Sequence, residues 1–169
     1  MTARIIDCNI WLTSAGKSGH MSNACQVLCL QWLQDFWKSK DSLVMDVLNS
    51  IGKEYRSNFR RHGVNPQDVA YQVLNSLQSA QTRRISYVQF EIDENGHAIL
   101  PEDYPPAVIE NADKKWIAAH LAHPERPVIY NAADTDWLKA EQFLIEKNIP
   151  VVNLCYLELQ EILAHKGAG

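Results

Sequence analysis

The stretch ARIIDCNIWL, residues 3–12, places an aspartate and an asparagine inside an apolar run near the start of the chain. Its apolar residues, with little alternation, predict a short strand over residues 4–10 that is covered on both faces. A carboxylate is costly in such a strand, so Asp7 calls for an explanation. In open α/β sheets, ligands bind beyond the carboxyl ends of the strands, and Asp7 lies near such an end. The stretch therefore predicts a parallel sheet with a site at its edge.

Short apolar segments alternate with helical patterns along the rest of the chain. Further strands are predicted at residues 42–46, 127–132 and 149–154, and helices at residues 23–38, 49–62, 65–80, 112–123, 137–148 and 157–165. The alternating segment that contains ENG at 94–96 predicts an extra β-hairpin around residues 84–99. This order predicts an α/β fold: one domain over residues 1–169, built as a three-layer α/β/α sandwich with a mostly parallel central sheet.

The composition narrows the class of protein. A chain of 169 residues with 46% hydrophobic residues suits one globular domain. The net charge of -4 argues against nucleic-acid binding through bulk charge, although a local basic groove remains compatible with it. No apolar run approaches the ~20 residues of a membrane span and no leader is recognised, so the expectation is a cytoplasmic protein without a membrane partner. Cys25 and Cys29, four residues apart on a predicted helix, are interpreted as buried free thiols.

Carboxylates recur at the ends of predicted strands and the starts of predicted helices. Asp134 and Asp136 directly follow the strand at 127–132. Asp113 opens the helix before that strand, and Glu54 lies in the helix after the second strand. Carboxylates that converge raise one another's pKa unless a cation neutralises them, and Mg²⁺ and Mn²⁺ prefer oxygen ligands. Each acid is equally explained as a helix cap, a first-turn acid or a solvated ion pair, and both interpretations stay open.

Three segments of the chain resemble the PIN-domain family of metal-dependent ribonucleases. They are RIIDCNIWL at residues 4–12, LVMDVLNSIGKEYRSNF at 43–59 and DKKWIAAHLAHPERPVIYNAADTDWLKAEQFLIEKNIPVVNL at 113–154. The resemblance implies a fold like that of RNase H and flap nucleases, a Mg²⁺ or Mn²⁺ cofactor and hydrolysis of single-stranded or structured RNA. It implies catalytic and metal-binding roles for Asp7, Glu54, Asp113, Asp134 and Asp136. Which member of the D-x-D pair faces the metal is left open, and residues 84–106 lie outside the resemblance.

Several polar residues are candidates for binding the substrate. Arg56 and Arg60 lie at i and i+4 on one predicted helix, and Lys17 lies in the loop after the first strand. Asn9 would bond an acid or the substrate, or satisfy backbone groups at the strand end. The cations are also explained as solvated surface charges. The expected partner is RNA. Because many family members are toxins of toxin–antitoxin pairs, an antitoxin-like inhibitor protein and a homo-oligomer are also considered.

Two other functions compete with the metal-dependent endoribonuclease. The first is a degenerate PIN-like module that binds RNA or protein without catalysis. The second is a phosphatase-like hydrolase with Asp7 as nucleophile, which requires a general acid two residues later, where this chain has Asn9. A nucleotide-cofactor enzyme is disfavoured, since neither a GxGxxG motif nor a P-loop is present. The endoribonuclease, acting through carboxylate-bound Mg²⁺ or Mn²⁺ and an activated water, is the preferred hypothesis.

Overall fold

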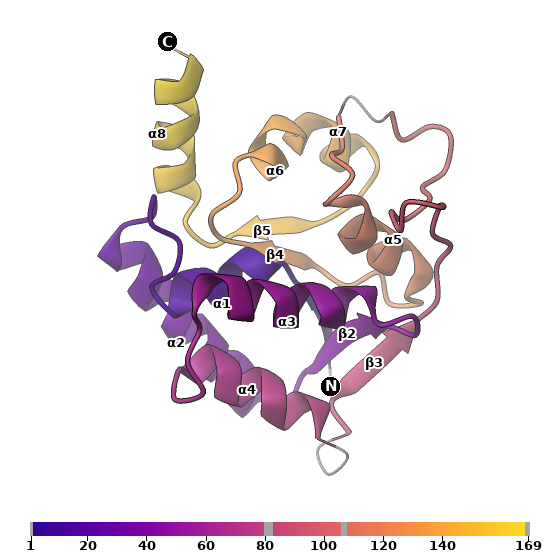
Figure 1. Ribbon diagram of the computed structural model, residues 1–169. Helices are drawn as coiled ribbons and strands as arrows, with labels where there is room; N and C mark the ends of the chain where they lie inside the picture. Colours follow the sequence, from indigo (N-terminus) through magenta and orange to yellow (C-terminus); the bar gives the residue numbers. More distant parts are fainter. Residues whose placement is uncertain (1, 80–82, 106–107, 168–169) are drawn as a thin grey trace.

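A five-stranded, all-parallel sheet forms the centre of the protein (Figure 1). The computed structural model describes residues 2–79, 83–105 and 108–167. The strand order is β3-β2-β1-β4-β5. The strands are β1 (Ala3–Ile6), β2 (Ser42–Asp46), β3 (Ile85–Val88), β4 (Ile129–Asn131) and β5 (Val151–Asn153). The central strands are almost completely buried, as the apolar segments predict.

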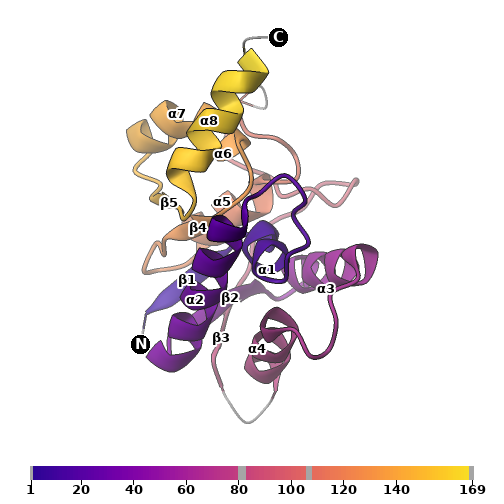
Figure 2. The same cartoon turned by 90° about the vertical axis from the view of Figure 1, so that its left-hand side faces the viewer.

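Helices cover both faces of this sheet. Those of the described chain are α1 (Cys8–Ser14), α2 (Asn23–Ser39), α3 (Ser50–His62), α4 (Val69–Gln78), α5 (Lys114–Ala122), α6 (Asp136–Lys139), α7 (Glu141–Glu146) and α8 (Tyr156–Gly167). Helices α1 to α4 gather on one face, and α5 to α7 lie across the sheet from them (Figures 1 and 2). The architecture is thus α/β and consistent with the predicted three-layer sandwich. Within the described segments, no helix is both long and apolar enough to cross a membrane.

The strand order reverses at β1, and this reversal positions the site. The chain leaves β1 to build β2 and β3 on one side and later returns to build β4 and β5 on the other. At such a switch point the connections diverge and leave a crevice beyond the carboxyl ends of the strands. Asp7 directly follows β1 and Asp134 follows β4, with the Asp7 amide donating to the Tyr130 carbonyl at 2.9 Å. Both acids therefore lie at this crevice.

Aromatic packing holds the end of β1 in place. Trp11 of α1 and Tyr55 of α3 are fully buried and contact edge to face, with ring centroids 5.7 Å apart. The Tyr55 hydroxyl donates to the carbonyl of Ile6, the last residue of β1. On its other side Tyr55 stacks against Trp116 of α5. The residue before Asp7 is thereby fixed by helices from both layers.

The predicted strand over residues 4–10 is wrong in its second half. The strand ends at Ile6, and the chain turns at Asp7 directly into α1. Asp7 is the N-cap of this helix, and its side chain accepts from the Asn9 amide. Helix α1 is almost entirely buried between the sheet and its neighbours, with Thr13 and Ser14 buried beside its apolar residues, so its sequence shows no exposed polar stripe. A short run of this kind does not distinguish a buried helix from a buried strand.

The predicted hairpin around residues 84–99 is also wrong. Its first half, β3, pairs in parallel with β2 as an edge strand of the main sheet. The ENG segment does form a turn, with Gly96 at φ +82°, but it closes only an isolated bridge between Ile92 and Ala98. The following chain crosses to the other face, where Tyr104 packs edge to face on Phe143 of α7. Most of the segment 84–106, which lies outside the PIN-domain resemblance, is therefore the connection from β3 to α5.

Two other boundaries differ from the prediction. The helix expected at 137–148 is divided into α6 and α7 at Ala140. The helix expected at 65–80 begins only at Val69, and residues 80–82 lie outside the described part of the chain. The remaining predicted helices and strands occur with boundaries shifted by a few residues, which is the ordinary uncertainty at element ends.

The interpretation of Cys25 as a free thiol is wrong, because Cys25 forms a disulfide with Cys155. The bond joins α2 to the start of α8, and Ser22 adds hydrogen bonds to Glu158 beside it. Cys29 is free and buried as predicted, and its sulfur lies within 4.8 Å of the other two. Because disulfides persist mainly in oxidising compartments, the cytoplasmic location stays a prediction.

Removing this disulfide is expected to destabilise the protein. It closes a loop with a sequence separation of 130 residues, so Cys155→Ser should lower the free energy of unfolding by about 2–4 kcal/mol. Chemical denaturation of the wild type with and without dithiothreitol measures this loss. Cys155→Ser is the control, since the reductant should not affect it further. Four reactive thiols in the unreduced, denatured wild type would contradict the pairing.

Candidate metal centre

Three aspartates from distant parts of the sequence converge at the switch point. Asp7 caps α1, Asp113 precedes α5, and Asp134 lies in the loop after β4. Each offers a carboxylate oxygen, and these oxygens all lie within 4.8 Å of one another. We call these three residues the aspartate cluster. They line a cavity of about 660 Å³ at the carboxyl edge of the sheet.

Asp7 is the most buried member of the cluster, with 5% of its surface exposed. One carboxylate oxygen accepts from the Asn9 amide at 3.2 Å, and the other accepts from the indole nitrogen of Trp137 at 2.8 Å. Burial raises the pKa of Asp7 to about 7, against the lowering effect of the Trp137 hydrogen bond, and the nearby Asp134 raises it further. Trp137 thus holds the carboxylate in one orientation.

The pKa values of the other two members of the cluster, Asp113 and Asp134, are also raised. Burial, followed by the charges of Asp7, Asp134 and Asp136, raises the pKa of Asp113 to about 8. Burial also raises the pKa of Asp134, whose carboxylate accepts from the Asp136 amide at 2.8 Å. No Lys, Arg or His of the described residues forms an ion pair with any member of the cluster. When the cluster ionises, its negative charge therefore has no ion-paired cation among the described residues.

The remaining two predicted acids line the cavity but have cationic partners. Glu54 projects from α3 and forms an ion pair with Lys115 of α5. Asp136 forms an ion pair with Lys139 at 2.5 Å, one turn along α6. Of the D-x-D pair, it is thus Asp134 that joins the cluster. Glu54 is close enough to contribute to the raised pKa of Asp7, so it forms part of the same electrostatic field.

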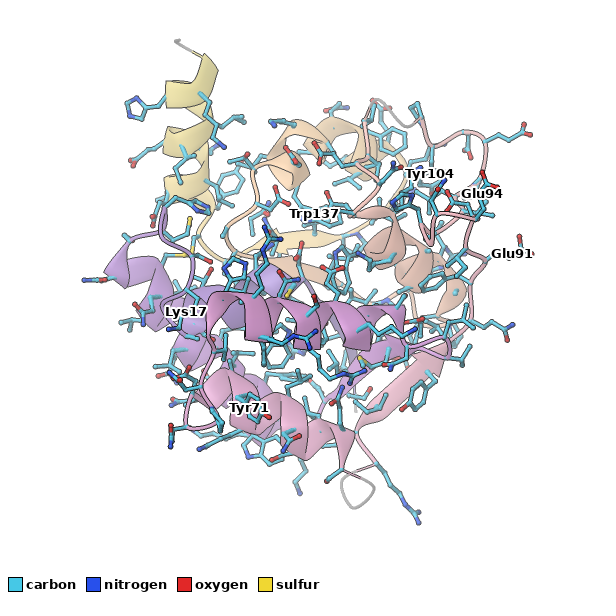
Figure 3. The ribbon with its side chains drawn as sticks, in the orientation of Figure 1. Lys17, Tyr71, Glu91, Glu94, Tyr104 and Trp137 are labelled. Carbon is cyan, nitrogen blue, oxygen red and sulfur yellow. A yellow bond between two sulfur atoms is a disulfide. The ribbon has the colours of Figure 1, made fainter. Side chains whose placement is uncertain are left out.

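The predicted substrate-binding residues separate into two groups. Lys17 lines the cavity and lies near the C-terminal end of α3 (Figure 3). Asn9 lines the cavity as well. Arg56 and Arg60 do not: they line a different groove, between α3 and α4. The sequence correctly placed both arginines on one helical face, but that face points away from the aspartates.

Asn9 and Asn131 shape the loop that carries Asp134. The Asn9 side chain donates to Asn131 at 2.8 Å and accepts from the amides of Ala132 and Ala133. Asn131, which is fully buried, bonds both the amide and the carbonyl of Asp134. The asparagine two residues after Asp7 therefore has a positioning role, one of the two alternatives that the sequence left open.

Sequence reasoning missed several residues of the site. Neither Trp137 nor Asn131 received a role. His20, His62 and Lys166 also line the cavity, although they lie far apart in the sequence. The position of Trp137 directly after the D-x-D pair is only a weak signal for its contact with Asp7, because a lone tryptophan is more often simply part of a core.

The donor set fits a hard divalent cation. Mg²⁺ and Mn²⁺ favour carboxylate oxygens and retain several waters, for which the cavity has room. The fold and site thus define a parallel α/β domain with a buried carboxylate centre at its topological switch point. Comparisons of the chain with protein-family models, with curated proteins and with solved structures found no match.

Proposed function

We propose that this protein is a Mg²⁺- or Mn²⁺-dependent endoribonuclease of the PIN-like type. The observation that carries the proposal is the aspartate cluster: three carboxylates within 4.8 Å, two buried and one partly buried, with raised pKa values and no ion-paired cation among the described residues. Such an arrangement opposes folding unless positive charge is supplied from outside the chain. The order of the acids along the chain, which resembles the PIN-domain pattern, supports RNA as the substrate.

The residues of the cavity have complementary tasks in this proposal. Asp7, Asp113 and Asp134 would hold the cation, and Trp137 and Asn131 would keep two of these carboxylates in position. When bound, the cation would supply Lewis acidity and a water of lowered pKa. Lys17 and Lys166, from opposite ends of the chain, would offer positive charge to the phosphate.

A cleavage assay tests the proposal directly. A fluorescently labelled single-stranded RNA should be cut internally in the presence of Mn²⁺ or Mg²⁺ and remain intact in EDTA. A DNA of the same sequence, incubated in parallel, distinguishes a ribonuclease from a general nuclease. An absence of RNA cleavage with every divalent cation tried would overturn the proposed activity.

A degenerate module without catalysis is the main alternative, and cation binding separates the two. Isothermal titration with Mn²⁺ should give one or two sites for the proposed enzyme. The retention of three clustered carboxylates, two of them buried, favours cation binding, since a module without a cation gains nothing from their mutual repulsion. An absence of Mn²⁺ binding would favour the degenerate module.

The phosphatase-like alternative is disfavoured by the contacts of Asp7 and Asn9. Both oxygens of Asp7 accept hydrogen bonds, which reduces their nucleophilicity. Asn9 occupies the position that this chemistry reserves for a general acid, and its amide is engaged with Asn131 and the β4 loop. Mass spectrometry after incubation with a phosphate analogue should therefore show no adduct on Asp7.

Trp137→Phe is expected to weaken cation binding by about 10–100-fold, the usual cost of removing a group that orients a metal ligand. The substitution keeps most of the buried aromatic volume but removes the indole donor to Asp7. Titration with Mn²⁺ measures the change. Trp32→Phe, in the contact with Tyr130 and Arg4 away from the cavity, is the matched control and should leave the affinity unchanged. Equal affinities for both variants and wild type would remove Trp137 from the site.

A further inference from the structure

A second polar hollow lies between α3 and α4, apart from the aspartate cluster. It has a volume of about 560 Å³, and the residues that decide its chemistry are Lys53, Arg56, Arg60, Tyr71, Asn75 and Gln78. We call it the basic groove. Its floor is apolar, and Tyr71 packs there against Phe59 of α3 with ring centroids 6.1 Å apart. Figure 3 shows Tyr71 on α4, on the side of α3 away from Trp137.

The cations of the basic groove are not neutralised by the protein. Lys53, Arg56 and Arg60 are exposed, and none of them forms an ion pair with a residue in the described part of the chain. Among the described residues, no Asp or Glu lines the groove. Three cations and one aromatic side chain thus line the same groove on a protein whose net charge is -4. This local excess of positive charge is directed toward an anionic ligand.

The basic groove continues past Arg56 toward the end of the sheet. Arg56 and Gln78 also line an adjoining hollow that includes Tyr87 of β3, whose side chain is 65% exposed. Among the described residues, the one acid that lines this hollow is Asp46, whose carboxylate accepts hydrogen bonds from the backbone amides of Ser50 and Ile51 at the start of α3. The two adjoining hollows together therefore present three cations and two tyrosine rings, Tyr71 in the first and Tyr87 in the second.

Helix α3 forms the wall between the two sites. Glu54, Asn58 and His62, spaced at i, i+4 and i+8, line the cavity of the aspartate cluster. Lys53, Arg56 and Arg60, on the neighbouring stripe, line the basic groove. The two sites are thus separated by roughly the 10 Å width of one helix. The ionised carboxylates of the acidic cavity repel a polyanion, so a basic surface nearby would add to its binding energy.

We propose that the basic groove binds the phosphodiester backbone of single-stranded RNA, with Tyr71 and Tyr87 as stacking surfaces for its bases. Cations that follow the backbone, combined with aromatic side chains, are the general means of binding single strands. The choice of RNA rests on the proposed function. The groove itself rests on the unpaired cations and the aromatic rings, which do not depend on catalysis.

The experiment measures binding without cleavage. Fluorescence anisotropy of a labelled single-stranded RNA is recorded in EDTA, at several salt concentrations, for wild type, Arg60→Glu, Arg56→Glu and Arg61→Glu. Arg61 is exposed on the same helix but lines neither site, so it is the matched control for charge. Arg60→Glu and Arg56→Glu should each weaken binding about tenfold or more and reduce the salt dependence by about one phosphate contact. Arg61→Glu should have a much smaller effect, and thermal melting checks that all variants are folded.

Two other outcomes would contradict RNA binding in the basic groove, and neither of them tests the nuclease activity. Equal losses for Arg60→Glu and Arg61→Glu would mean that only overall charge matters. Displacement of the RNA by an equal concentration of a polyglutamate peptide would identify an acidic protein segment as the occupant instead. Conversely, specific losses for the groove variants, together with an absence of Mn²⁺-dependent cleavage, would retain the groove and reject the proposed activity.

Discussion

Asp7→Asn is expected to reduce Mn²⁺-dependent RNA cleavage by about three orders of magnitude, because the cation contributes several kcal/mol to transition-state stabilisation and each 1.36 kcal/mol is tenfold in rate. Asp7 is the most buried member of the aspartate cluster, and Trp137 fixes the orientation of its carboxylate. An asparagine keeps the shape of the side chain but removes its charge. The same variant should lose most of the heat of Mn²⁺ binding in a titration.

Asp46→Asn is the matched control for this prediction. Asp46 also ends a central strand and is 2% exposed, but its carboxylate accepts from the Ser50 and Ile51 amides rather than joining the cluster. Its substitution should lower stability by about 0.5–2 kcal/mol through the weakened helix cap, and leave Mn²⁺ affinity unchanged. Wild-type cleavage by Asp7→Asn would place the active centre elsewhere.

The second large effect is on stability as a function of pH and cation. In the folded protein the pKa values of Asp7 and Asp113 are raised to about 7 and about 8, from 3.8. The folded state therefore keeps these protons at pH values where the unfolded chain has already lost them. In EDTA, the free energy of unfolding should fall between about pH 4 and pH 8, by roughly 4 kcal/mol from Asp7 alone and by more with Asp113 included. The stabilisation is fully present below the unfolded pKa and is lost as pH rises through the folded values.

Mn²⁺ should reverse this loss. A cation binds the ionised carboxylates of the folded state and competes with the protons, so its stabilising effect grows as the pH rises. At a hundred times its Kd it contributes about 2.7 kcal/mol. Thermal melts at pH 5, 6, 7 and 8, with EDTA and with Mn²⁺, measure both effects. Asp113→Asn should flatten the profile in EDTA and abolish the response to Mn²⁺. A wild-type melting temperature that does not depend on pH in EDTA would contradict the raised pKa values.

The two sites of the proposal make different demands on the protein. The aspartate cluster requires precise positions for buried carboxylates, which strand ends, helix caps and the Asn9–Asn131 pair provide. The basic groove requires only exposed cations along a shallow path, which one stripe of α3 provides. If the proposal holds, net charge would be a poor guide to RNA binding, because the acidic and basic surfaces lie on opposite sides of one helix.

The sequence by itself determined the α/β class, the central strands and the group of acids near the strand ends. These features depend on local pattern: apolar runs of strand length, helical spacing and polar residues where an apolar run stops. It also placed Arg56 and Arg60 on one face of α3, since helical spacing alone fixes that. The sequence did not distinguish the start of α1 from a continuation of β1, because a short buried helix lacks the exposed polar stripe by which a helix differs from a buried strand.

Only the tertiary structure decided which acids meet. Asp134 joins Asp7 and Asp113, whereas Asp136 and Glu54 have lysine partners, and no local pattern distinguishes these cases. The Cys25–Cys155 disulfide and the contact of Trp137 with Asp7 likewise join residues 130 positions apart. The physical reason is that a carboxylate's role depends on what surrounds it in space, and those neighbours are set by the order of the strands in the sheet.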